Sequence, residues 1–340
     1  MGLIRAFCAA ALLLVAANVF AAKTDVVVLQ NGDHITGEVK ELKRGQLKLD
    51  TDEAGTIYIE WDKIAAVTTA GRYEVGTRDG AFYIGTLAPD TSGRFQVIAE
   101  DGTIARIAYL EAVSAWPIRS GFFQGIDGTL DVGASFTKST GVGEISIDVE
   151  AARRRPGYDA FTEFSSNLTR QRDSSSTTRF TWLSGYTRFR EDRWFFRPFI
   201  FVERNPDLGL TVRSSAAMSV GRYLQRSNHS TTLMTVGAAA GREWLTDGDP
   251  ILNLDALVTF ATSFYRYDYP RTTVDLSVMV FPELNHWGRV RTNVNAKLKR
   301  ELVRDFTAGV SLYDTFDSQP QVPNVSRNDV GVTLSLGWTF

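Results

Sequence analysis

The sequence predicts an all-β protein: a transmembrane antiparallel β-barrel of about twelve strands, preceded by a small soluble β module with two repeats. Residues 330–340 read VGVTLSLGWTF, so apolar residues alternate with small or polar ones. This is the pattern of a strand with one face toward lipid and the other toward a polar lumen. Runs of similar texture fill residues 119–340, and residues 25–118 carry one β pattern twice.

Residues 1–22 have the features of a secretory signal peptide. Arg5 is followed by an apolar stretch over 6–20 and by small residues before the expected cleavage point. The sole cysteine, Cys8, lies inside this segment, so the mature chain is expected to lack disulfides and cysteine catalysis. The 37 basic and 39 acidic residues of the whole chain leave no basic excess, which argues against a nucleic-acid partner.

Residues 23–118 form the predicted soluble module. Asn31-Gly32-Asp33 marks a hairpin turn between two alternating runs, and 78–80 takes its place in the second copy. Each copy ends in an apolar patch, 61–67 and 109–116, that can close an SH3-like or Sm-like roll. Two roles stay open: the module binds a periplasmic polymer or partner, or it is a compact plug or vestibule at the barrel mouth. The recurring positions, spaced by 48, are Gly37, Gly45, Leu47 and Leu49 with Gly85, Gly93, Phe95 and Val97; a further match, 55–59 with 102–106, is spaced by 47.

Pro117 and Gly121 end the repeat pattern, so the barrel domain is expected over 119–340. An even number of runs puts both barrel ends on the side of the module, and we expect the cylinder to be closed. The run from Trp194 is apolar on both faces, which predicts a packed interior patch. The expected strands are 128–138, 144–154, 159–171, 178–190, 194–205, 210–224, 231–245, 252–269, 272–284, 290–302, 306–318 and 328–340.

Charged residues opposite the apolar alternation are expected to line the lumen, because Arg or Lys facing lipid at midplane costs roughly 2–4 kcal/mol. Acids dominate the first strands and a basic ladder lies on 290–302. Either a water-filled lumen with opposed walls passes small polar solutes, or the charges pair across a narrow interior and fill it. The candidate lumen-lining residues are Asp131, Glu144, Asp148, Glu150, Glu163, Arg197, Glu203, Arg213, Glu243, Asp255, Asp275, Arg291, Lys297, Lys299 and Glu301.

Enzymatic chemistry is not expected. Outer-membrane hydrolases need a base such as histidine beside a nucleophile. The three histidines fall in the soluble hairpin (His34), an inner turn (His229) and an outer loop (His286). The pairs Asp247/Asp249 and Asp314/Asp317 are interpreted as turns, since calcium needs six to eight oxygen ligands. The sequence therefore predicts no catalytic residue, no cofactor and no metal site.

Several segments together resemble a known family. They are DVVVLQNGDHITGEV (25–39) with the following GQLKL and IEWDKI, LDVGASFTKSTG (130–141), and SLYDTFDSQP (311–320). On these residues the chain resembles the YdiY-type salt-induced outer-membrane proteins, the family of domain of unknown function 481. The resemblance implies an outer-membrane barrel linked to salt or osmotic stress, and it transfers no catalytic residues. The second copy of the N-terminal unit departs from the family pattern.

The expected location is the outer membrane of a Gram-negative bacterium, with the module in the periplasm. Expected partners are outer-membrane lipid, the barrel assembly machinery, which would recognise the C-terminal strand through Trp338 and Phe340, and a periplasmic partner of the module. The expected function is a small passive pore or envelope-maintenance protein. The alternative is a membrane-anchored structural or binding protein with a closed barrel, whose module engages a partner.

Overall fold

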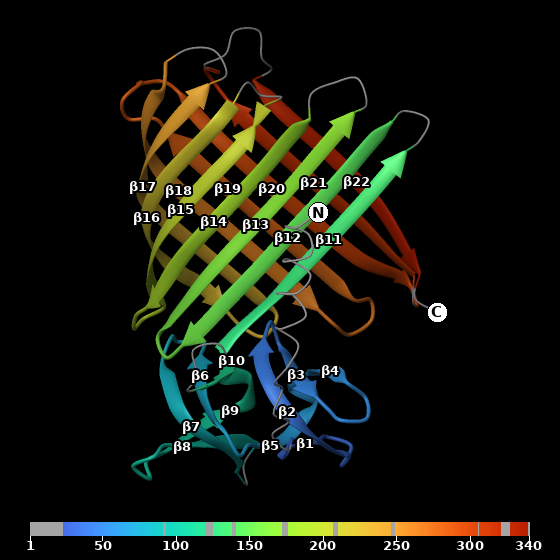
Figure 1. The fold of residues 1–340 in the computed structure, drawn as a ribbon. Coiled ribbons are helices and arrows are strands. Elements are labelled where there is room, and N and C mark those ends of the chain that lie inside the picture. The colour runs from blue at the N-terminus through green and yellow to red at the C-terminus, as the bar shows by residue number, and fades with distance from the viewer. Residues whose placement is uncertain are drawn as a thin grey trace, which may run out of the picture.

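The chain folds into two β-sheets that follow one another in sequence (Figure 1). The computed structural model describes residues 23–90, 93–119, 125–137, 141–171, 176–206, 210–245, 249–304, 306–320 and 327–338. The expected signal peptide and Phe340 lie outside these residues. In the described part of the chain, no helix has the length and apolar character needed to cross a membrane.

The N-terminal sheet has ten strands and two copies of one topology. In each copy the first strand pairs with the second strand on one side and with the last strand on the other, and this closes a small roll. The first copy is β1 (Asp25–Leu29), β2 (His34–Lys43), β3 (Gln46–Asp50), β4 (Thr56–Glu60), the 3-10 turn η1 (Trp61–Lys63) and β5 (Ile64–Thr68). The second is β6 (Arg72–Thr77), β7 (Phe82–Pro89), β8 (Arg94–Ile98), β9 (Ile104–Ala108), η2 (Tyr109–Glu111) and β10 (Ala112–Pro117).

The two copies keep a spacing of 48 through β4 and β9, where the glycines had indicated 47. Ile59 of β4 and Ile107 of β9 are both buried and differ by 48 in number. The glycine before each strand occupies a different turn position: Gly55 directly precedes β4, whereas Gly102 lies two residues before β9. Both glycines have positive φ, so they follow the local turn and not the register of the repeat.

One hydrophobic core joins the two copies of the module. The rings of Trp61 and Tyr109, at equivalent positions, are 5.2 Å apart, and Phe95 packs edge-on against Trp61. The indole nitrogen of Trp61 donates to the carbonyl oxygen of Tyr109 at 2.5 Å. Across the copies, the hydroxyl of Tyr73 donates to the carboxylate of Asp25 at 3.0 Å. Each copy therefore completes the packing of the other.

The second sheet has twelve strands in sequence order, each antiparallel to its neighbours. All twelve expected runs are strands, with ends that differ from the expected ones by three residues or fewer. They are β11 (Ile126–Thr137), β12 (Val142–Arg155), β13 (Tyr158–Gln171), β14 (Thr177–Phe189), β15 (Trp194–Asn205), β16 (Leu210–Arg226), β17 (Ser230–Leu245), β18 (Ile251–Arg266), β19 (Thr272–Pro282), β20 (Val290–Val303), β21 (Phe306–Asp317) and β22 (Asn328–Trp338).

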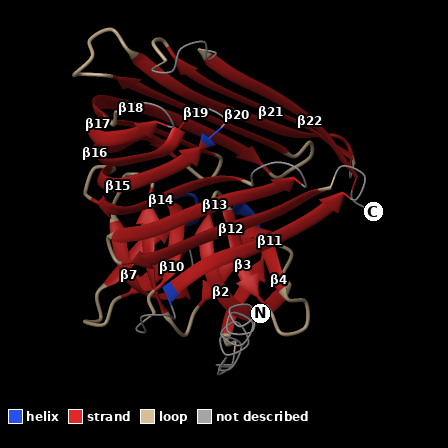
Figure 2. Ribbon diagram, turned by 45° about the horizontal axis from the view of Figure 1, so that its top comes forward, coloured by secondary structure: helices blue, strands red, loops and turns tan. Residues whose placement is uncertain are grey.

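The sheet rolls into a barrel that is open along one side. Contacts between non-neighbouring strands, described below, identify its concave face, and the alternating apolar residues such as Leu130 and Leu334 lie on the convex face. In the described residues no ladder joins β11 to β22, so the expected closed cylinder is not formed (Figures 1 and 2). Alternation fixes which face a side chain takes, whereas closure depends on tilt and stagger, which alternation does not report.

Candidate pore interior and its two ends

The fourteen residues expected to line the lumen, and Glu163 with them, lie on the concave face. Cross-strand partners share one face of a sheet. Asp131 is paired with Asp148, and the row continues through Ser165 and Thr181 to Glu203. Each of the other candidates lies an even number of residues along its strand from a member of this row or of the cluster described next, or is paired with such a residue, so it shares the same face.

A cluster of ion pairs, here called the outer cluster, lies at the barrel end farthest from the module. Arg213 of β16 contacts Glu203 at 3.1 Å and Glu243 at 3.0 Å. Arg291 of β20 contacts Glu243 at 3.4 Å and Asp255 of β18 at 2.6 Å. Because Arg291 reaches strands two and three places away, these side chains must lie inside the roll. The structure thus brings five of the candidates into one network.

The sequence interpretation missed four members of the outer cluster. Asn253 donates to Glu243 at 2.6 Å, and Arg289 contacts Glu283 at 3.0 Å and Asp317 at 2.6 Å. Glu283 and Arg289 are almost fully buried although they flank an outer loop. Both lie one residue outside β19 and β20, so strand alternation could not place them. Asp317, interpreted as a turn residue, is here an ion-pair partner.

The two walls away from this cluster carry charges of opposite sign. Asp131, Asp148 and Glu150 on β11 and β12 are exposed, as are Lys297 and Lys299 on β20. None of these five has an ion pair within the described part of the chain. Exposed charges of this kind need water around them, because an unpaired ion is costly to desolvate.

Three of the remaining candidates have local roles on the concave face. Glu144 accepts a hydrogen bond from Asn167 at 2.6 Å, and Glu301 accepts one from the backbone N–H of Arg271 at 3.1 Å. Arg197 lies over the rings of Phe195 and Phe161, 5.1 and 5.8 Å from their centroids. Phe195 is almost fully buried, so the interior patch expected on the run from Trp194 is present.

The module sits against the opposite end of the barrel, called here the inner end (Figure 1). Arg44, at the tip of the β2–β3 hairpin, contacts Asp275 of β19 at 3.1 Å, and its guanidinium lies 4.9 Å from the ring centroid of Tyr265. Asp275 also accepts a hydrogen bond from Ser263 at 2.6 Å. Sequence alternation identified Asp275 as lumenal, but nothing in it pointed to Arg44 as the partner.

A second contact region holds β6 of the module to the turn between β12 and β13. The carboxylate of Glu74, only 3% exposed, contacts Arg154 at 3.1 Å and accepts a hydrogen bond from the backbone N–H of Gly157 at 2.6 Å. Arg154 also packs over Phe189, 4.4 Å from its ring centroid. Phe189 in turn packs against Phe82 of the module at 6.0 Å. Both carboxylate oxygens of the buried Glu74 therefore have a partner in the barrel.

The turn between β16 and β17 makes the third contact. The side-chain amide of Asn228 donates to the carbonyl oxygen of Ala112 at 3.1 Å, and Arg226 donates to the hydroxyl of Ser114 at 2.9 Å. Gly45 lies so close to the carbonyl oxygen of Asn228 that a side chain at this position would collide with it. The module is therefore fitted to the inner end at the start of β19 and at two turns, those between β12 and β13 and between β16 and β17.

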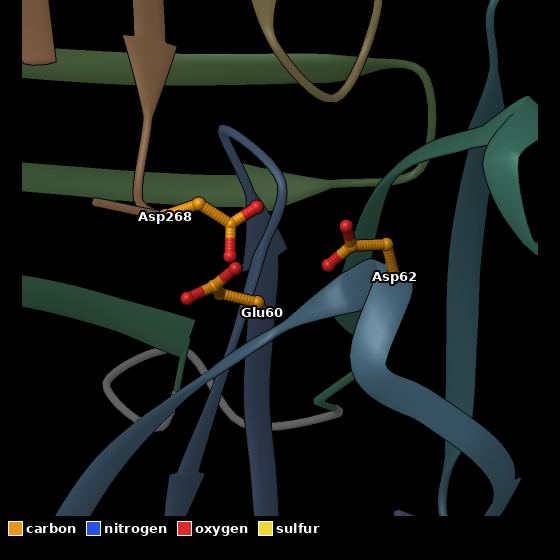
Figure 3. Close-up of side chains that lie close together, drawn as sticks. All are labelled: Glu60, Asp62 and Asp268. Atoms are coloured by element: carbon orange, nitrogen blue, oxygen red, sulfur yellow. The ribbon is translucent and has the colours of Figure 1, made fainter. Parts of the chain in front are cut away.

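Three carboxylates from both parts meet at the inner end: Glu60, Asp62 and Asp268, whose oxygens lie within 4.8 Å of one another (Figure 3). Burial, together with the neighbouring charge of Asp268, raises the pKa of Glu60. Lys63 contacts Asp268 at 3.4 Å and supplies a positive charge. The ion pair between Lys63 and Asp268 therefore joins module and barrel directly beside these three carboxylates.

The remaining singled-out residues lie apart from these regions. Trp338 is exposed at the end of β22, at the open edge of the sheet. His34 and His229 lie in the module and an inner turn, whereas His286 is hydrogen-bonded to Glu283 at the rim of the outer cluster. In the described residues, no histidine ring is hydrogen-bonded to a hydroxyl group, and the hydroxyl of Ser227 accepts from the backbone N–H of His229.

Comparison with known proteins gives little further identification. No family model and no curated protein matches the chain. A solved structure described as the NanC porin in a rhombohedral crystal form is similar over 62% of this chain and 100% of its own, with 11% sequence identity and a TM-score of 0.38. A score of this size assigns neither fold nor function.

Proposed function

We propose that this chain is an outer-membrane β-barrel that forms a small passive pore for polar solutes, with its module on the periplasmic side. The observation that carries the proposal is the pair of opposed walls inside the roll. Asp131, Asp148 and Glu150 face the interior from one side and Lys297 and Lys299 from another, without ion-pair partners in the described residues. A dry interior would not hold five such charges.

The convex face supports a membrane location. Large apolar side chains such as Leu130, Val332 and Leu334 are more than half exposed there. A contiguous apolar surface of this extent is unfavourable in water and typical of contact with lipid. Fractionation of cells that express the tagged chain tests the location: recovery in the outer-membrane fraction is expected, and recovery in the soluble periplasm would contradict it.

Planar-bilayer recording of the refolded full-length protein tests the pore. Reproducible current steps are expected, and Lys297→Glu with Lys299→Glu should shift ion selectivity toward cations because the basic wall is lost. Arg106→Glu is a matched control, since Arg106 lies on β9 of the module and pairs with Asp90 at 3.6 Å. Unchanged selectivity in the lysine variant would contradict the wall assignment.

A second candidate function is a membrane-anchored protein whose barrel does not conduct. The fitted contact between module and barrel, with Glu74 buried at its centre, favours this candidate. If planar bilayers show no current steps with the wild-type protein or with variants that weaken the contact between module and barrel, this result would support the non-conducting anchor over the pore. In that case a periplasmic partner should be recovered by cross-linking to the module's exposed edge strand β9.

The family resemblance adds a physiological proposal, an envelope role under salt or osmotic stress. Growth of a deletion strain in high-salt medium checks it. Slower growth that is restored by the wild-type chain is expected, and growth equal to that of the parent strain would contradict this role.

A further inference from the structure

The inner end of the barrel is occupied by the module, and the contacts on its two sides differ in kind. At one side the β2–β3 hairpin places Arg44 against Asp275 inside the roll. At the other side Glu74 binds the turn between β12 and β13. The two sites are six strands apart in the rolled sheet, since Asp275 belongs to β19 and the Glu74 site to the start of β13.

The ion pair at the Glu74 side is largely shielded from water. Glu74 is 3% exposed and the Arg154 side chain 13% exposed. Removing one member of a buried pair leaves the other charge uncompensated, which is strongly unfavourable. The end of the module is also tied to the barrel near this side, because Arg155 donates to the carbonyl oxygen of Arg119 at 2.8 Å.

The Arg44 side is held more loosely. The side chains of Arg44 and Asp275 are 37% and 40% exposed, and those of Lys63 and Asp268 about half exposed. Ion pairs with this exposure contribute little and are screened by salt. A cavity of about 210 Å³, lined mainly by module residues such as Arg44, Lys48 and Tyr58 and by Tyr267 of the barrel, lies beside the hairpin.

We propose that the module is a hinged inner gate: it stays attached through Glu74 and opens by withdrawing the β2–β3 hairpin, with the Arg44–Asp275 pair as its latch. This inference rests on the proposed pore. Withdrawal would break the half-exposed pairs and lift Gly45 off the carbonyl oxygen of Asn228, whereas the contacts of Glu74 would stay intact. It would also free Asp275, which lies beside Lys297 in the register of β19 and β20, to contribute to the lumen wall.

Charge reversal at the latch tests the gate. Arg44→Glu sets two carboxylates against each other and should raise the open probability of the channel roughly two- to tenfold. Asp275→Arg should act in the same direction, and the double variant Arg44→Glu/Asp275→Arg should return open probability to the wild-type value. Arg106→Glu, which reverses a charge on the module away from the barrel, should have no effect. Failure of the double variant to restore closure would overturn the latch.

A distance measurement separates failure of the gate from failure of the pore. Spin labels at Ile104→Cys on the module and Trp287→Cys on an outer loop occupy exposed positions, 45% and 90% exposed in the wild type. The otherwise wild-type protein should give one distance population, Arg44→Glu should add a longer one, and the double swap should remove it. Unchanged distances in Arg44→Glu would overturn the gate. Shifted distances without current in any variant would sustain the hinge and overturn the pore.

Discussion

Arg291 on β20 and Asp255 on β18 lie 2.6 Å apart, across the intervening strand β19. This contact, with the second one from Arg291 to Glu243, ties the concave faces of strands that share no backbone hydrogen bonds. Local curvature of the sheet at the outer end is therefore fixed by side-chain charges as well as by the ladder.

Arg291→Met should destabilise the barrel. The change leaves Asp255 and Glu243, both almost fully buried, short of a positive partner, and a loss of about 3–5 kcal/mol in the free energy of unfolding is expected. Denaturant titration in detergent micelles measures it. Lys299→Met is the control, because Lys299 is exposed and has no ion pair among the described residues; equal losses in both variants would contradict a special role for the cluster.

Trp61→Ala should unfold the module far more readily than changes on its surface. Trp61 is the largest fully buried side chain and packs against Phe95 and Tyr109, so removing its ring should cost about 3–5 kcal/mol. Tyr58→Ala, at an exposed position on β4, should stay within about 0.5 kcal/mol. Circular dichroism during denaturation compares the two variants, and similar stabilities would contradict a shared core.

The module should lose stability at alkaline pH. Burial raises the pKa of Tyr109 to about 12, whereas an unfolded tyrosine titrates near pH ~10. The stabilising contribution of the neutral phenol is therefore complete below about pH 10 and is lost as pH rises toward 12. Thermal melting as a function of pH should show this decline, and Tyr109→Phe should reduce it. Tyr58→Phe should leave the decline unchanged; a decline of equal size in all three proteins would point to another group.

In the membrane, β11 and β22 should pair and close the barrel, because unpaired strand edges are not tolerated in hydrocarbon. Two conditions limit the register of this pairing: the apolar faces of both strands must point outward, and the strands must overlap along their full length. Under these conditions Asp131 lies opposite Thr333 or Ser335. A disulfide should therefore form within one chain between Asp131→Cys and one of those two positions. The pair Asp131→Cys and Leu334→Cys, on opposite faces, should not react. Cross-links between two chains would show that the edges pair with a second copy.

Much of the barrel followed from the two-residue period of apolar side chains. In β12, for example, Ile145 and Ile147 fix the face and the length of the strand. The same period placed Glu243, Asp255 and Arg291 inside, because a charge facing lipid is costly. Their mutual contacts depend on which non-neighbouring strands the curvature brings together, and a sequence pattern carries no such information.

Other features could not be predicted from the alternation of apolar residues, and the physical reason differs from one feature to the next. Glu283 and Arg289 belong to a loop, where alternation has no meaning. Arg44 acts through a partner more than two hundred residues away in the chain. In the module, Gly55 and Gly102 gave a spacing of 47 because glycine marks a turn, whereas the buried Ile59 and Ile107 mark the repeat.

The module contacts the inner end of the barrel within the segment from β12 to β19. The last three strands, β20 to β22, make none of the contacts described above. A folding chain can thus finish the N-terminal roll first and use it as a template on which the middle of the barrel is shaped. The carboxyl-terminal strands, which lack such contacts, would then be the ones left to pair with β11. Completion of the wall is then the concluding event of assembly, made by the segment that ends in Trp338.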